Sequence, residues 1–240
     1  MPDGTPTTAI TDAHYDASVT RADRRVGEII DTLKKSGEYD DSLIVLLSDH
    51  GESLTEHGIY HDHHGLYDVS THIPMIVRPP NGASTTVSEF VQITDIAPTV
   101  ESYTDTDGIT ADGYSLQPVI NGEESIGRQY ILAEEAHTQR RRMVRSDEFN
   151  LIYSLDGNLV CRYCDVQHAP DTELYDVVAD EDELTNIAED NAEKVAELRE
   201  YGDRKAEEFE SRKPSPASGE KVTYDDEQEV EERLEALGYR

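Results

Sequence analysis

The feature that most constrains this fold is a short apolar run, Leu43–Leu47, which stands between a helical pattern and a polar loop. From Thr11 to Gly37, apolar residues recur every three or four positions, which predicts a helix with one buried stripe that ends at Gly37. A continuous apolar run of this length is typical of a strand buried on both faces of a parallel sheet. A helix followed by such a strand predicts an α/β fold.

Side chains that can bind ions or donate protons follow directly after the predicted strand. Ser48–Glu52 reads Ser-Asp-His-Gly-Glu, and open α/β sheets bind their ligands in the crevice at the carboxyl ends of the strands. A second strand is expected at Ile73–Val77, and six of the nine histidines fall between residues 50 and 72. We therefore expect the functional site in the loop between these two strands.

Asp49 and His50 form the first candidate pair. Because they are adjacent at a strand end, one turn of the chain can aim a carboxylate oxygen and an imidazole nitrogen at a common point, which suits a divalent cation. The alternative is structural: Asp49 caps the next turn and His50 is an ordinary loop residue. Gly51 permits close approach of the backbone and favours the functional interpretation.

A second candidate cluster contains four histidines, His57, His61, His63 and His64. Histidines are common zinc ligands, although no second Cys/His group with zinc-finger spacing accompanies them. One or two of them could instead donate to a substrate oxyanion or act as a general acid, and the third alternative is a plain polar loop. We predict the anion or acid role for His63 or His64 and the loop role for His57, and leave His61 open.

The second half of the chain has a different pattern. Residues 130–175 contain short β-prone segments separated by turns, which predicts a small antiparallel layer. We expect an α/β part at 11–125, a small α+β subdomain at 126–190, and an acidic helical tail at 191–240 with a Pro/Ser/Gly linker at 213–219.

The chain is strongly acidic: its 240 residues include 52 Asp and Glu against 21 Lys and Arg, a formal net charge of −31. Nucleic acid and anionic membranes would be repelled, so we expect neither as a partner. Arg outnumbers Lys, and this balance resembles proteins adapted to high salt, which suggests a halophilic archaeal host.

No leader or membrane-length apolar run is recognisable, which predicts a cytoplasmic location. Cys161 and Cys164 allow at most one local disulfide or half of a metal site.

Several segments in order resemble the second half of a sulfatase of the alkaline-phosphatase superfamily. Several independent motifs in sequence are much harder to match by chance than one. These segments are Ser48–Glu52, Glu56–Tyr60, His63–Tyr67, Ile73–Arg78, Thr94–Thr99, Asp112–Pro118, Glu173–Val177 and Asp182–Ala188. The resemblance implies an alkaline-phosphatase-like α/β fold, a mostly parallel sheet flanked by helices, with its N-terminal half missing and a small α+β C-terminal subdomain.

The resemblance also implies a function. It makes the chain a sulfuric ester hydrolase that acts on a sulfate-ester substrate at a Ca²⁺-type site, or with another divalent cation such as Mg²⁺. Asp49 and His50 match the family's late metal-ligand pair. His63 stands where many members carry a Lys that contacts the sulfate, and His64 is next to it, so these two are the candidate catalytic residues.

The sequence departs from the family at the nucleophile. Members make a formylglycine from the Cys or Ser of a Cys/Ser-x-Pro-x-Arg motif, but none of the ten prolines here has Cys or Ser two positions before it. The family's early Asp-Asp metal pair is missing as well. We therefore expect a C-terminal portion of a sulfatase, inactive alone and completed by a separately encoded N-terminal half or by upstream sequence. Two alternatives stay open: a phosphate or phosphonate ester hydrolase of the same superfamily, and a non-catalytic folded remnant.

Overall fold

The computed structural model describes residues 8–60, 62–82, 85–104, 106, 112–136, 138–162 and 165–212. The chain divides into two compact units, residues 1–205 and 206–240, and the contacts discussed below lie within the first. His61, Cys164 and the linker at 213–219 fall outside the described residues. In the described part of the chain, no helix combines the length and the apolarity needed to cross a membrane.

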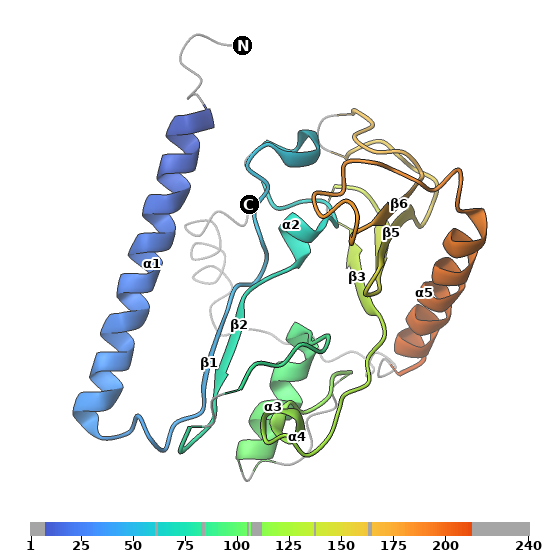
Figure 1. Ribbon diagram of the computed structural model, residues 1–240. Coiled ribbons are helices and arrows are strands. Elements are labelled where there is room, and N and C mark those ends of the chain that lie inside the picture. Colours follow the sequence, from blue (N-terminus) through green and yellow to red (C-terminus); the bar gives the residue numbers. More distant parts are fainter. Residues whose placement is uncertain are drawn as a thin grey trace, which may run out of the picture. The chain divides into compact units, whose positions relative to one another are not determined.

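The first element, α1 (Thr8–Ser36), confirms the helix predicted before the first strand (Figure 1). The helix ends as predicted at Gly37, whose φ of 79° is the left-handed conformation typical of the residue after a helix. Its apolar stripe is not buried, because no described helix or strand packs extensively against α1. The predicted burial is therefore wrong within the described residues, where Tyr15, Val19 and Ile29 are 42%, 52% and 61% exposed.

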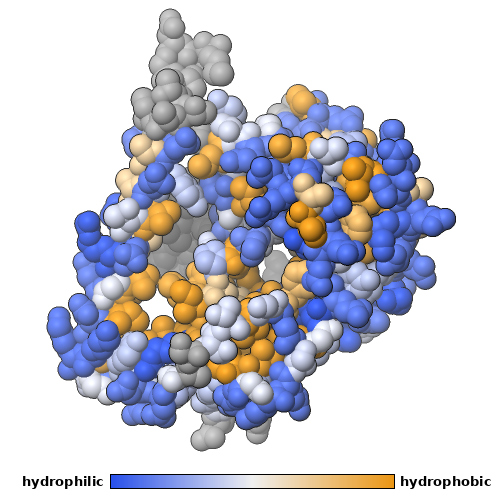
Figure 2. All heavy atoms as spheres, viewed as in Figure 1, coloured by the Kyte–Doolittle hydropathy of each residue, from blue (hydrophilic) through white to orange (hydrophobic). Residues whose placement is uncertain are grey.

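The two predicted strands are present as β1 (Ile44–Leu47) and β2 (Met75–Arg78), and they pair antiparallel with Leu46 opposite Ile76. The expected parallel pairing is not found between them. A parallel pair needs a long crossover, usually a helix, whereas the chain between these strands forms only short helical turns and folds back. Burial on both faces is also wrong for this pair, since Leu46 is 39% and Ile76 60% exposed. Figure 2 shows hydrophobic residues at the surface of the molecule in this view.

Among the described residues, five short helices lie between β1 and the second sheet. Two of them belong to the loop between β1 and β2, and three follow β2. They are η1 (Glu56–Gly58), α2 (Asp68–Thr71), η2 (Ile93–Asp95), α3 (Ile96–Tyr103) and α4 (Gln117–Ile120).

A buried ion pair fixes the segment that follows β2. Asp95 is fully buried, and both of its carboxylate oxygens accept hydrogen bonds from the Arg128 guanidinium at 2.7 Å. The backbone N–H of Tyr114 donates to the same carboxylate at 2.8 Å. Gly113 is needed for this close approach, because a Cβ there would lie 2.1 Å from the carbonyl oxygen of Thr94. Asp95 and Gly113 therefore have structural roles.

The antiparallel layer predicted in the second half is a four-stranded sheet with the order β3-β4-β5-β6. Every neighbouring pair in it is antiparallel, as expected. A long helix, α5 (Ala192–Arg212), follows the sheet and confirms the helix predicted there (Figure 1). The strands are β3 (Ile131–Glu135), β4 (Arg141–Arg145), β5 (Phe149–Ser154) and β6 (Thr172–Asp176).

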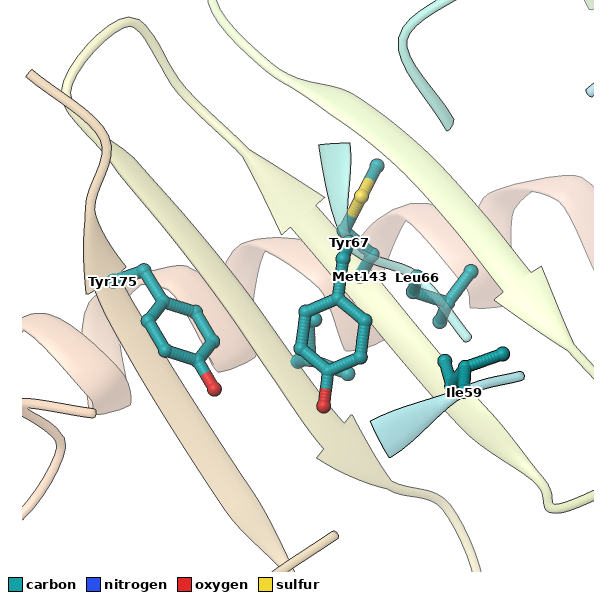
Figure 3. Packing of buried hydrophobic residues seen from close by; sticks show 6 residues of the cluster. Ile59, Leu66, Tyr67, Met143 and Tyr175 are labelled. Carbon is teal, nitrogen blue, oxygen red and sulfur yellow. The ribbon is translucent and has the colours of Figure 1, made fainter. Parts of the chain in front are cut away.

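This sheet has two apolar faces, because successive side chains along a strand point to opposite sides. One face packs against residues of the β1–β2 loop and forms a core of Ile59, Leu66, Tyr67, Met143, Ile152 and Tyr175 (Figure 3). The other face packs against α5 and forms a core of Val144, Leu151, Tyr153, Leu174 and Leu198. We call residues 48–67 of the β1–β2 segment the histidine-rich loop. This loop is therefore anchored in the core of the C-terminal sheet.

Candidate metal and anion site

The chain turns sharply after β1, and backbone contacts hold this turn against α2. The Gly51 N–H donates to the Ser70 carbonyl at 2.8 Å. A side chain at position 51 is excluded, since a Cβ there would lie 2.0 Å from the Val69 carbonyl oxygen. Ser53 and Asp62 exchange both backbone hydrogen bonds, at 3.0 and 3.2 Å. The end of β1 is thereby placed beside the segment that carries His63 and His64.

Asp49 and His50 stand at this turn with polar atoms near each other: Asp49 Oδ2 lies 3.8 Å from His50 Nε2. The His50 Nδ1 lies 2.7 Å from the Gly51 carbonyl oxygen. A carbonyl can only accept, so Nδ1 carries the proton and a neutral ring keeps its lone pair on Nε2. A carboxylate and an oriented imidazole fit two positions of a divalent-cation site.

His63 and Glu52 join this pair. The rings of His50 and His63 stack with their centroids 4.1 Å apart and their planes 21° apart. One ligand atom each from His50, Glu52 and His63 lies within 4.8 Å of the others. Glu52 was not among the predicted site residues, although it closes the Ser48–Glu52 segment. The position of Glu52 within that segment could have indicated a role in the site. Because acidic residues are so common in this chain, a single glutamate did not stand out.

Asp62 connects the two adjacent histidines. Its carboxylate accepts the His63 backbone N–H at 2.7 Å and lies 3.5 Å from His63 Nδ1 and 3.3 Å from His64 Nδ1. Burial opposes ionisation of this carboxyl, but the His63 N–H and the His64 ring outweigh it, and the pKa of Asp62 is lowered. The side chain of His64 is only 22% exposed, whereas that of His63 is 55% exposed.

A further histidine approaches this group from the C-terminal part of the chain. The ring centroid of His168 lies 6.1 Å from that of His64, with the planes tilted by 53°. His168 was not predicted as a site residue, because about a hundred residues separate it from the loop and no motif contains it. The C-terminal part of the chain thus brings one histidine ring near His64.

His57 lies away from this group. Its ring stacks on Tyr67 with centroids 3.7 Å apart and nearly parallel planes. Burial lowers the pKa of His57, and the negative charges of Glu173 and Glu56 oppose that shift. His57 is therefore part of the packing of the loop, and the polar-loop role expected for it stays a prediction.

The buried carboxylate of Glu173 connects the histidine-rich loop to the C-terminal sheet. Glu173 accepts hydrogen bonds from the phenols of Tyr67 at 2.9 Å and Tyr175 at 2.7 Å. The Arg141 guanidinium lies 2.6 Å from the other carboxylate oxygen, although the two groups are not aligned as a hydrogen bond. Burial, and then the Glu173 charge, raise the pKa of both tyrosines.

A second buried carboxylate lies at the start of α2. Glu183 accepts hydrogen bonds from the Asp68 backbone N–H at 2.7 Å and from the Asn150 amide at 2.5 Å. Arg145 pairs with the Asp68 carboxylate at 3.1 Å. Burial raises the pKa of Glu183 to about 7, against the lowering effect of its hydrogen bonds. These contacts hold the C-terminal end of the histidine-rich loop.

Comparisons with known proteins identify relatives of this chain. A family model described as Sulfatase matches residues 4–106. Choline-sulfatase of Rhizobium meliloti is 32% identical over 183 residues, which cover 73% of this chain and 32% of that protein. The chain thus spans about a third of the length of the curated relatives it matches.

Solved structures extend the likeness to the fold. A protein determined in complex with its substrate D-glucosamine-2-N,6-O-disulfate has a TM-score of 0.68 and 27% identity, covering 82% of this chain and 40% of that one. The phosphonate monoester hydrolase of Agrobacterium radiobacter has a TM-score of 0.62 and 25% identity, covering 80% and 40%. The expected alkaline-phosphatase-like α/β fold is therefore confirmed. Motifs, relatives and fold together place this chain in the sulfatase family of the alkaline-phosphatase superfamily.

Proposed function

We propose that this chain forms part of a sulfuric ester hydrolase in which Asp49 and His50 supply two ligands of a divalent-cation centre, with Ca²⁺ or Mg²⁺ as the cation. One observation carries this proposal. The His63 ring stacks on the His50 ring at 4.1 Å, so the position that the resemblance gives to sulfate contact lies beside the proposed metal ligands.

The histidines next to the metal pair would bind the sulfate group. His63 and His64 follow one another beside the Asp62 carboxylate, which can orient both rings as hydrogen-bond donors. Hydrogen bonds from such donors stabilise the negative charge that develops on the transferred group and on the leaving oxygen. A bound divalent cation would add Lewis-acid stabilisation of the same charge.

The nucleophile would come from polypeptide outside this chain. The sequence has no Cys/Ser-x-Pro motif, and it spans about a third of the length of its relatives. Exposed apolar side chains support a partner surface for a sulfatase N-terminal half. They lie on both strands of the first sheet and along α1, and Leu46, Ile76, Tyr15, Val19 and Ile29 are among them.

A phosphonate or phosphate ester hydrolase is the second candidate. It is favoured by the fold similarity to the phosphonate monoester hydrolase of Agrobacterium radiobacter. Sulfate and phosphate esters share a tetrahedral geometry, so the same histidines would bind either group. These two candidate functions differ in which ester, sulfate or phosphonate, is hydrolysed faster.

The test is reconstitution with a sulfatase N-terminal half that carries Cys/Ser-x-Pro-x-Arg, co-expressed in a host that converts this residue to formylglycine. We expect no turnover of 4-nitrophenyl sulfate by the chain alone, turnover by the pair, and loss of turnover in a pair that carries Asp49→Asn. Faster hydrolysis of a phosphonate monoester would favour the second candidate. A pair that co-purifies without any turnover would identify the chain as a non-catalytic remnant.

A further inference from the structure

Three side chains, from the turn after β1 and from the segment facing it, are of the types that bind transition metals. His50, Glu52 and His63 each bring one ligand atom, and these atoms lie within 4.8 Å of one another. We propose that these three residues bind a zinc-class ion directly in this chain, without a contribution from any other polypeptide.

The ring of His50 is held in the form that a metal requires. Its Nδ1 donates to the Gly51 carbonyl at 2.7 Å, so a neutral ring presents the lone pair of Nε2. Histidines that bind metals commonly donate their other ring N–H to a backbone carbonyl or a carboxylate, which fixes the tautomer and the direction of the ring. His63 has the carboxylate counterpart, because its Nδ1 lies 3.5 Å from Asp62 Oδ1.

The ligand types select the class of ion. Two imidazoles and one carboxylate, with a position left open, form a His₂Glu set that zinc accepts in a four-coordinate site. Ca²⁺ prefers six to eight oxygen ligands, and this group offers too few of them. Imidazole-rich sites suit Zn²⁺, Co²⁺, Ni²⁺ and Cu²⁺. We therefore expect a zinc-class ion to bind these residues more tightly than Ca²⁺ does.

The backbone around the three residues is fixed before any ion binds. Gly51 is bonded to Ser70, and Ser53 is bonded twice to Asp62, so both branches of the turn are tied on either side of the ligands. His50 and Glu52 are partly buried, and His63 is open to solvent. An ion can enter from the His63 side, and small side-chain rotations would bring the ligand atoms into its coordination sphere. A site held in this way loses less conformational freedom on binding.

This binding does not depend on the proposed hydrolysis, and its measurement involves no turnover. His50 belongs both to this three-residue site and to the Asp49–His50 pair proposed above as cation ligands. The two metal sites therefore compete for the His50 ring. When a zinc-class ion holds His63, contact with the sulfate falls to His64.

The experiment uses the full chain with Cys161→Ser and Cys164→Ser, so that thiolates do not bind the metal. Co²⁺ is titrated by visible absorption and Zn²⁺ by calorimetry, with the fold of each variant checked by circular dichroism. The matched variants are His63→Gln and Glu52→Gln, and His72→Gln is the control because this exposed histidine lies outside the three. Molar KCl suppresses nonspecific binding to the acidic surface.

We expect one Zn²⁺ per chain, a Co²⁺ spectrum with the strong bands of a tetrahedral site, and affinity about tenfold or more weaker in His63→Gln and Glu52→Gln. His72→Gln should bind as the parent does, and excess Ca²⁺ should not displace the ion. Three outcomes would overturn the proposal: no stoichiometric binding, equal loss in His72→Gln, or unchanged affinity in both ligand variants.

Discussion

The phenol of Tyr67 donates a hydrogen bond of 2.9 Å to the carboxylate of Glu173, across 106 positions of sequence. Tyr67 ends the histidine-rich loop, and Glu173 lies on β6 of the C-terminal sheet. Both are buried. The loop that carries the candidate site is thus held by a buried carboxylate of the C-terminal sheet.

Substitution of Glu173 should destabilise the fold strongly. Glu173→Gln leaves the Arg141 guanidinium buried without its counter-ion, which costs about 3–5 kcal/mol, whereas Tyr67→Phe removes one hydrogen bond worth about 1 kcal/mol. Urea denaturation measures both free energies of unfolding, with the exposed Glu181→Gln as the control. Equal, small effects of Glu173→Gln and Tyr67→Phe would contradict the role given to this ion pair.

Glu183 should make stability depend on pH. Its pKa is raised from 4.5 to about 7 in the folded state, so between these values the folded chain binds more protons than the unfolded chain. Its contribution is therefore complete below the unfolded pKa and is lost as pH rises to about 7, on the order of 3 kcal/mol.

Glu183→Gln should remove this dependence. The free energy of unfolding of the wild type, relative to the variant, is expected to fall as pH rises from about 5 to about 8. Chemical denaturation at a series of pH values gives this difference directly. A constant difference across the range would show that burial does not shift this carboxyl as described.

Gly113 should tolerate no side chain. A Cβ at this position would meet the Thr94 carbonyl oxygen at 2.1 Å, so Gly113→Ala must displace backbone and should destabilise the fold by about 2–3 kcal/mol. Gly27→Ala is the matched control, because a Cβ added at this position would have nothing within 4 Å and alanine favours a helix over glycine by about 1 kcal/mol. Thermal melts compare the two variants, and similar midpoints would rule out the close approach.

Salt should stabilise this chain if its acidic surface is an adaptation to high salt. With a net charge of −31, carboxylates repel over a Debye length of about 30 Å at 0.01 M salt, and over about 3 Å at 1 M. The unfolding midpoint by circular dichroism should therefore rise with KCl. A midpoint that is flat or falls would remove this explanation of the composition and leave the family assignment untouched.

Local sequence patterns predicted the helices and strands of this fold better than they predicted which elements pack or pair with one another. The apolar period of α1 and the helix-forming composition of α5 gave both helices nearly to their ends, since such signals are contained within each segment. The apolar run at β1 predicted a strand but not its antiparallel neighbour or its exposure. Which surface covers a strand depends on residues far away, and a local pattern does not contain them.

The same distinction applies to the site. Adjacent residues such as Asp49 and His50 could be grouped from the sequence because they share one turn. Glu52 joined them only when the turn after β1 was fixed, and His168 only when the C-terminal sheet was placed beside the loop. The roles of His63 and His64 stay predictions: the structure places the His63 ring against His50, and the activity of variants decides between the two histidines.

We propose that Asp49, His50 and a neighbouring histidine act together in sulfate-ester hydrolysis. The most direct test is kcat/KM for 4-nitrophenyl sulfate in the reconstituted pair, with Asp49→Ala and His64→Ala compared with the control His72→Gln. We expect losses of about a hundredfold or more in the first two variants, since each removes stabilisation of the transition state, and wild-type activity in the control. Undiminished activity in Asp49→Ala and His64→Ala would contradict the claim.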